Sequence, residues 1–225
     1  MIEGETAHYL LRVLRLTVDK SIHLFNGEGG YYLANVAGMD KRSLSVMPVK
    51  FIKEEKESNL RLTLAQGISR GQKMDYTIQK SVELGVSCIV PVMTEFSNVK
   101  LTDERATGRV LHWKKIIISA CEQCGRNRIP EILGPVPLKE WVEQDSSRIK
   151  LVLDPEAERT LSDVSGPDTG VTLLSGPEGG LSEHDLEEIF SAGYQAVRLG
   201  PRTLRTETAA VAAIAACQSL WGDMR

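Results

Sequence analysis

The segment Val171-Thr-Leu-Leu-Ser175 runs directly into Gly176-Pro-Glu-Gly-Gly180 and then into Leu181-Ser-Glu-His-Asp185. Its first part is a short apolar run bounded by turn residues, which is typical of a buried strand. The glycines permit positive φ and remove side chains where a planar ligand would lie against the backbone. Ser182, with Asp185 after it, is typical of a helix N-terminus with a capping box. The segment therefore predicts a strand, a tight glycine loop and a capped helix.

A second segment of the same kind runs from Val197 to Ala210. It predicts a short strand, a charged loop stiffened by Pro201, and a helix of small residues. Arg202, Arg205 and Glu207 crowd beside that helix, and such charges are costly unless they are paired or functional. One interpretation is a structural ion pair between Glu207 and one of the arginines. The other is that the two loops meet at a cofactor.

The glycine loop matches neither of two common nucleotide motifs. A Walker A loop ends in Gly-Lys-Ser/Thr, but no lysine follows Gly180. A dinucleotide fingerprint follows the first strand of its domain, where this chain reads Gln66-Gly-Ile-Ser-Arg-Gly71 with a different spacing. Taken alone, the loop is also typical of a strand-to-helix turn that binds nothing. The loop lies late in the chain, whereas ordinary doubly wound cofactor folds have their glycine loop early in the domain.

The apolar pattern divides at Glu54-Glu-Lys-Glu-Ser-Asn59, a charged run that we interpret as a linker. Before it we expect a short helix at His8–Leu14 and a small β-barrel. The barrel strands are predicted at Ile22–Phe25, Tyr31–Val36 and Ser43–Pro48, with a glycine-rich hairpin at Asn26–Gly30. Such modules bind RNA in some proteins and only pack against a neighbour in others.

After the linker, strands and helices alternate, which predicts a parallel α/β domain. The expected strands are Leu60–Ala65, Val86–Val92, Ile149–Leu153, Val171–Leu174 and Ala196–Leu199. The expected helices are Gly71–Leu84, which Gly85 ends, and Arg105–Cys124. We therefore place the domains at residues 1–57 and 58–225.

Composition limits the function classes. The chain is 42% hydrophobic and 25% charged, which are ordinary globular values. Its N-terminus lacks the apolar core of a secretory signal, and its longest apolar run, Ala209–Cys217, is too short to span a bilayer. We expect a cytoplasmic protein without a membrane partner.

The net charge of −3 argues against a nucleic-acid partner, but the charge is unevenly distributed. Residues 61–150 carry 14 Lys and Arg against 10 Asp and Glu, whereas residues 151–225 carry 5 against 12. A basic patch outside the last third is therefore compatible with a polyanionic partner.

Cys121-Glu-Gln-Cys124 is a lone C-x-x-C. It lacks the second cysteine pair or spaced histidines of a zinc site, and the strand-to-helix placement of a redox pair. We expect reduced thiols and no metal. The residues that follow, Gly125-Arg-Asn-Arg-Ile-Pro130, end the helix, so Arg126 and Arg128 should project from its boundary. Cations there complement the helix dipole, and they also suit an anionic or nucleotide substrate.

Together these motifs resemble the 16S ribosomal RNA uridine-N3 methyltransferases, the RsmE family. The resemblance rests on Glu122-Gln-Cys-Gly-Arg126, Gly176-Pro-Glu-Gly-Gly180 and Leu199–Thr208. His8–Arg15 and Gln79–Val86 match the family pattern as well. The similarity runs from about His8 to the C-terminal helix, which is nearly the whole chain.

The resemblance implies a SPOUT-type α/β domain with a C-terminal trefoil knot, and an N-terminal PUA-like RNA-binding barrel that lacks the family's first strand. It implies methylation of uridine N3 in 16S rRNA of the 30S subunit, S-adenosylmethionine as the cofactor, and a homodimer. Two alternatives stay open: a non-catalytic SPOUT-like RNA-binding or ribosome assembly factor, and a methyltransferase that acts on another RNA.

The resemblance also implies site residues. The cofactor is expected to contact Leu174, Ser175, Gly176, Glu178, Gly179, Gly180, Leu199, Gly200, Leu204 and Thr206. We expect catalytic roles for Arg126, Arg205 and Glu122, with Arg126 at the target uridine or its phosphate and Arg205 near the methyl group. The expected RNA contacts are Arg12, Arg15, Arg126 and Arg128.

Overall fold

The computed structural model of this chain describes residues 1–97, 103–167 and 170–225. These residues form two compact units, and each is described by itself. The first unit contains Met1–Lys56 together with Gly125–Ile129, and the second contains Glu57–Cys124 and Pro130–Arg225. The short excursion of Gly125–Ile129 into the first unit was not predicted, because sequence order gives no sign of it.

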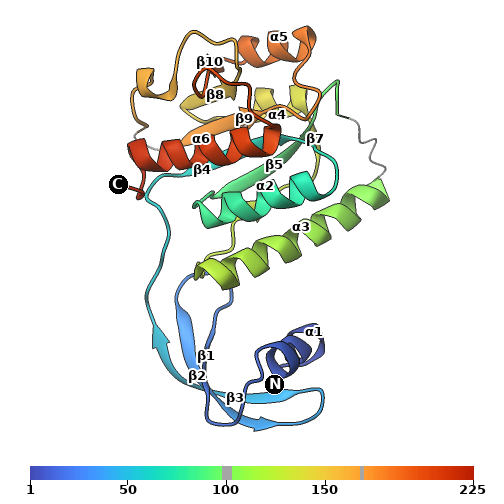
Figure 1. Ribbon diagram of the computed structural model, residues 1–225, viewed down its shortest axis with the longest axis vertical. Helices are drawn as coiled ribbons and strands as arrows, with labels where there is room; N and C mark the ends of the chain where they lie inside the picture. Colours follow the sequence, from blue (N-terminus) through green and yellow to red (C-terminus); the bar gives the residue numbers. More distant parts are fainter. Residues whose placement is uncertain (98–102, 168–169) are drawn as a thin grey trace. The chain divides into compact units, whose positions relative to one another are not determined.

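The first unit is built on a three-stranded antiparallel sheet in the order β1-β2-β3 (Figure 1). Its elements are α1 (Gly4–His8), the π-helix η1 (Tyr9–Val13), β1 (Ser21–Leu24), β2 (Tyr31–Met39) and β3 (Leu44–Ile52). The predicted hairpin between β1 and β2 is confirmed, with Leu24 opposite Tyr32. Ala7, Val36 and Leu44 are fully buried and form its small core. Strand pairing gives an open sheet among the described residues, so barrel closure stays a prediction.

The second unit contains a parallel sheet, as predicted, and this sheet has seven strands among the described residues (Figure 1). Its order is β10-β8-β9-β4-β5-β6, with β7 paired to β5. The strands are β4 (Leu62–Gly67), β5 (Cys88–Met93), β6 (Glu131–Ile132), β7 (Val136–Pro137), β8 (Ile149–Leu153), β9 (Val171–Ser175) and β10 (Gln195–Val197). We did not predict β6 and β7, because two-residue strands carry no periodic signal.

Helices connect the strands of this sheet. They are α2 (Gln72–Glu83), α3 (Asp103–Cys124), α4 (Leu138–Gln144), the 3₁₀ turn η2 (Leu161–Asp163), α5 (Glu183–Ser191) and α6 (Thr206–Trp221). The helices expected at Gly71–Leu84 and Arg105–Cys124 are confirmed as α2 and α3. Gly85 ends the first with φ +84°. The short α4 and η2 were not predicted.

The sheet is buried on both faces, which is why its strands read as continuous apolar runs. Leu174 and Ala65 belong to a core that includes Leu138 of α4 and Ile189 of α5. Their sequence neighbours Leu173 and Leu64 are also fully buried, and alternation along a strand turns them to the opposite face. α6 packs against β9, β4 and α2 (Figure 1).

Three neighbouring strands have their carboxyl ends at the same end of this sheet. β8 ends at Leu153, β9 at Ser175 and β10 at Val197, and all three are parallel. In open parallel sheets, ligands bind beyond the carboxyl ends of the strands, because the loops diverge there.

Candidate functional site: a cavity at the carboxyl ends of the strands

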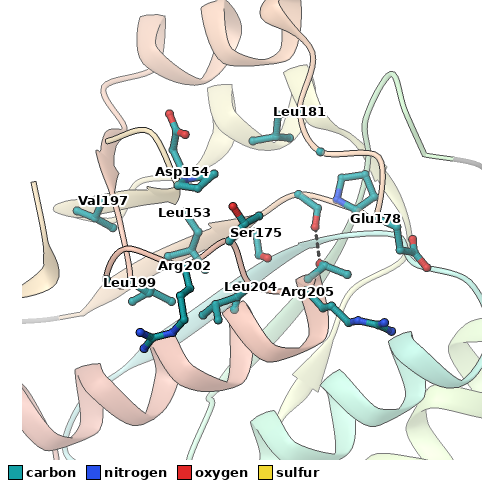
Figure 2. Close-up of a pocket in the computed structure, with 18 of the residues that line it drawn as sticks. Leu153, Asp154, Ser175, Glu178, Leu181, Val197, Leu199, Arg202, Leu204 and Arg205 are labelled. Atoms are coloured by element: carbon teal, nitrogen blue, oxygen red, sulfur yellow. Dashed lines mark hydrogen bonds between the residues drawn. The ribbon is translucent and has the colours of Figure 1, made fainter. Parts of the chain in front are cut away.

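A cavity of about 430 Å³ lies at this end of the sheet, within the second unit (Figure 2). The loop after β9, the segment before α6 and the ends of β8 and β10 line it. Its lining residues are Lys73, Leu153, Asp154, Pro155, Ser175, Gly176, Pro177, Glu178, Gly180, Leu181, Leu186, Val197, Leu199, Gly200, Arg202, Thr203, Leu204, Arg205, Thr206 and Ala209. The two segments singled out in the sequence therefore meet at one cavity.

The loop after β9 is held rigidly. The Gly180 N–H donates to Pro177 O at 3.0 Å, and Gly180 has φ +75°. Ser182 caps α5 in the predicted reciprocal box, where its Oγ accepts from Asp185 N and the Asp185 carboxylate accepts from Ser182 N, both at 3.0 Å. Both ends of this loop are thus fixed by hydrogen bonds.

The same loop packs closely against the end of β4. A Cβ added to Gly67 would lie 2.5 Å from Pro177 N and 2.8 Å from Gly176 C. These are backbone atoms, which cannot move away as a flexible side chain would. Gly67 is therefore required for the close approach of the loop to the sheet.

Hydrogen bonds also tie the two segments to each other. Thr206 Oγ1, in the first turn of α6, donates to Gly176 O at 2.6 Å. Gln66 Nε2 donates to Thr206 Oγ1 at 3.0 Å and to Gly176 O at 3.2 Å. Gln66 is fully buried, and its side chain therefore joins the two walls of the cavity from within the protein.

Charged side chains line the cavity, and Figure 2 shows Asp154 and Glu178 toward opposite sides of the view. Glu178 accepts from Arg70 N at 3.1 Å and pairs with Lys73 at 3.6 Å. Burial raises the pKa of the Glu178 carboxyl, but backbone N–H groups, Lys73 and Ser69 outweigh burial, so the net pKa lies below its usual value. Glu178 is therefore ionised at neutral pH.

Arg202 and Arg205 are exposed on the opposite segment. Among the described residues, no ion pair joins either arginine to Glu207, so the structural pair considered from the sequence is absent. Glu207 Oε2 is buried without a hydrogen-bond partner. The two guanidinium groups are thus available to a ligand.

Most of the predicted cofactor residues line the cavity: Ser175, Gly176, Glu178, Gly180, Leu199, Gly200, Leu204 and Thr206. Leu174 does not, because strand alternation turns it into the core on the face opposite to its neighbour Ser175. Gly179 is not a lining residue either. It packs against Phe96: a Cβ added to Gly179 would lie 3.0 Å from the Cβ of Phe96.

We did not predict the contributions of β8 and β10, which include Leu153, Asp154 and Val197. Both strands were expected from their apolar pattern, so a signal existed. Parallel strands place their carboxyl ends together, and the residue after Leu153 could have been recognised on that basis.

The residues predicted for catalysis and RNA binding are spread over both units. Arg205 lines the cavity, whereas Glu122 is exposed near the end of α3 and is not a lining residue. Arg126 belongs to the first unit and is 4% exposed. The expectation that it projects from the helix boundary is therefore wrong: Gly125, with φ +80°, follows the end of α3, and the residues after it belong to the first unit.

The other three predicted RNA contacts also lie in the first unit. Arg12 and Arg15 are exposed. Arg128 pairs with Glu55 at 2.7 Å, and this hydrogen bond lowers the pKa of the Glu55 carboxyl. Arg12 and Arg15 thus present positive charge on the surface of that unit, whereas the charge of Arg128 is paired with Glu55.

Cys121 and Cys124 are free thiols on α3. Within residues 1–97, 103–167 and 170–225, no group of His, Cys, Asp and Glu is arranged to hold a metal ion. No helix in the described part of the chain is long and apolar enough to cross a membrane.

Comparison with known proteins gives the family. A model of the RNA methyltransferase domain matches residues 56–218, and a model of the RNA methyltransferase PUA domain matches residues 2–47. The Ribosomal RNA small subunit methyltransferase E of Buchnera aphidicola from Schizaphis graminum is 37% identical, over 96% of this chain and 89% of its own. The chain belongs to the ribosomal RNA small subunit methyltransferase E family.

Solved structures of similar proteins agree with this assignment. A protein from Legionella pneumophila, solved with bound S-adenosylmethionine, has a TM-score of 0.95 at 38% identity, covering 99% of this chain and 92% of its own. The family member from Neisseria gonorrhoeae, also bound to S-adenosylmethionine, has a TM-score of 0.93 at 40% identity, covering 100% and 92%. The predicted family and its methyltransferase class are confirmed.

Proposed function

We propose that this protein transfers a methyl group from S-adenosylmethionine to N3 of a specific uridine in 16S rRNA of the small ribosomal subunit. The observation that carries the proposal is the single cavity in which the Ser175–Gly180 and Leu199–Thr206 segments meet at the carboxyl ends of β8, β9 and β10. Membership of the methyltransferase family and the bound cofactor of two similar structures support it.

The cavity suits a nucleoside cofactor. Its volume of about 430 Å³ lies within the usual range of ligand pockets. Leu199, Leu204 and Val197 offer apolar surface for a purine, and Gly176 and Gly200 leave the backbone accessible. The hydrogen bonds between the two walls preorganise this site for a compact, bent ligand.

Methyl transfer to a ring nitrogen is an in-line displacement, so much of the acceleration comes from positioning. S-adenosylmethionine supplies an activated methyl group on a sulfonium. The uracil must lose its N3 proton, and a cation beside the ring stabilises the resulting anion. Arg205 is suited to this role because it is exposed at the cavity and pairs with no described carboxylate. We assign contact with the target uridine or its phosphate to Arg126, and a further catalytic role to Glu122.

The proposed substrate surface includes the first unit. We assign RNA binding to a PUA-like domain at residues 1–57 and catalysis to residues 58–225. Arg12, Arg15 and Arg128 are the proposed phosphate contacts, and the family model of a PUA domain over residues 2–47 supports this division. Closure of the β1-β2-β3 sheet into a barrel belongs to the same proposal.

A trefoil knot and a homodimer complete the proposed architecture. The hydrogen bond from Thr206 to Gly176 supports the knot, because threading requires the two segments to lie against each other. The small residues of α6 support the dimer, since alanines let two helices approach closely. With ribosomal subunits as substrate, we place the protein in the cytoplasm.

The test is methylation of 30S subunits isolated from cells that lack this modification. The purified protein is incubated with them and isotopically labelled S-adenosylmethionine, and the 16S rRNA is digested to nucleosides for mass spectrometry. We expect one labelled N3-methyluridine per subunit. Cofactor binding without label in any RNA would identify a non-catalytic assembly factor, and label only in transfer RNA would identify a different substrate.

The RNA side of the site has its own test. Arg126→Ala is expected to keep cofactor affinity, measured by calorimetry, and to lose methylation of 30S subunits by about a hundredfold or more. Arg42→Ala, which removes an exposed arginine from the same unit, serves as the control. Equal turnover of the Arg126 variant and the control would remove Arg126 from the site.

A further inference from the structure

Asp154 is the first residue after β8 and lines the cavity at the carboxyl edge of the sheet. Its backbone is held in place, because Asp154 N donates to Val197 O at 3.1 Å and its own carbonyl accepts from Ala157 N at 3.2 Å. Pro155 follows, and a proline confines the residue before it to extended conformations. The position of the carboxylate is therefore set by the fold before any ligand binds.

The two oxygens of this carboxylate differ. Oδ1 accepts from Glu156 N at 2.9 Å, which anchors the side chain in a turn. Oδ2 accepts no hydrogen bond from any described residue, although Asp154 is half-buried. A half-buried carboxylate oxygen is stabilised by a donor, and an ionised carboxylate can only accept. Oδ2 is therefore open to a ligand that brings one or more hydroxyl or N–H groups.

Apolar side chains and one arginine line the part of the cavity that lies on the Asp154 side of the view. In Figure 2, Leu153, Val197, Leu199 and Arg202 lie on the same side of the view as Asp154, whereas Arg205 and Glu178 lie toward the other side. Glu178 is already engaged by Arg70 N and Lys73. The two carboxylates of the cavity thus differ in charge pairing: Glu178 has Lys73 as a cationic partner, whereas no described cation pairs with Asp154.

We propose that Asp154 binds the ribose hydroxyls of the cofactor, and so selects a ribonucleoside over a deoxyribonucleoside in this cavity. This inference rests on the proposed S-adenosylmethionine cofactor. A vicinal diol offers two donors to one carboxylate, which matches the open oxygen and the fixed backbone of Asp154. The adenine then lies on the Leu199 side, and the sulfonium end points toward Arg205 and Glu178.

The experiment is a mutant–ligand cycle with S-adenosylhomocysteine, which does not react, and its 2′-deoxy and 3′-deoxy analogues. Calorimetry measures the affinity of each for wild type, Asp154→Asn and Asp154→Ala. Wild type is expected to lose about tenfold or more when the contacted hydroxyl is removed, the cost of a hydrogen bond to a charged group. In Asp154→Ala that loss is expected to shrink to about twofold, the limit of additivity between uncoupled sites.

Glu156→Ala is the matched control, because it removes the same charge two residues away, does not line the cavity and keeps the backbone N–H that anchors Asp154. It is expected to discriminate as wild type does. Asp154→Asn keeps the shape of the side chain. If a thermal melt shows that Asp154→Ala is unfolded, discrimination between the ligands is measured with Asp154→Asn instead.

Three results would overturn the proposal. The first is undiminished discrimination by the variants. The second is a wild type that binds the deoxy analogues as well as S-adenosylhomocysteine. The third is a different contact for Asp154: the Asp154 variants would lose discrimination against an analogue that lacks the homocysteine amino group, and not against the analogues that lack a ribose hydroxyl. A wild type that binds no adenosyl ligand refutes the proposed cofactor instead, so the two failures are distinguishable.

Discussion

The two segments that form the cavity are built differently. The loop after β9 makes its contacts with itself and with the sheet. It forms its own turn and helix cap, packs against Gly67 and accepts a hydrogen bond from Gln66. The segment before α6 is attached at Thr206 but otherwise exposes Arg202 and Arg205. The first segment fixes the shape of the site, and the second supplies charge that the protein itself does not neutralise.

If this division is correct, the largest effect on turnover comes from the charged segment. Arg205→Ala is expected to lower methyl transfer by about a hundredfold, because it removes a cation from the site where negative charge develops. Stability should change by no more than about 0.5 kcal/mol, since the side chain is exposed. Rate assays on 30S subunits and chemical denaturation measure the two quantities. Arg198→Ala, an exposed arginine outside the cavity, is the control, and an equal loss of rate in both variants would contradict the division.

A change to the rigid segment should act on stability and binding together. Gly67→Ala drives a Cβ against the backbone of Pro177 and is expected to cost about 1–3 kcal/mol of unfolding free energy and to weaken cofactor binding. Gly108→Ala is the matched control, because a Cβ there meets nothing and alanine favours the helix by up to about 1 kcal/mol. A Gly67→Ala protein with wild-type stability and affinity would show that the loop adapts.

The tie between the segments should have an intermediate effect. Thr206→Val removes the hydroxyl that donates to Gly176 O and accepts from Gln66, and is expected to cost about 1–2 kcal/mol. Thr208→Val makes the same change at an exposed position in the same helix. Denaturant unfolding compares the two. If they are equally stable, the hydrogen bonds do not hold the walls together.

The smallest effect is expected at Glu178, and it depends on pH. Because its pKa is lower in the folded protein than in the unfolded chain, its contribution to stability is present at neutral pH and is lost as the pH falls through the folded-state pKa. Glu178→Gln should therefore be less stable than wild type at pH 7 and equally stable at acid pH. The difference at pH 7 is expected to be under about 1 kcal/mol, because Lys73 is partly exposed. Unfolding curves of both proteins across acid pH test this, and a gap that widens on acidification would refute it.

Local sequence signals accounted for much of the fold. The parallel strands, α2, α3, the hairpin of the first unit and the Ser182 cap each follow from a pattern within one segment, because periodicity and capping act over a few residues. The elements that escaped prediction are those too short for a period, such as β6, β7 and η2. The π-helix η1 was not predicted either, since the pattern at that place indicated only a short helix.

The sequence by itself determined which two loops bear the site and, through their resemblance to a known family, the class of reaction. Only the tertiary structure decided which side chains face the cavity. Leu174 and Ser175 are neighbours in one apolar run, yet strand alternation sends one to the core and the other to the site. Asp154, the residue after β8, joins Ser175 at the cavity because parallel pairing brings the carboxyl ends of β8, β9 and β10 together. That convergence depends on contacts between residues far apart in the chain, which no local pattern encodes.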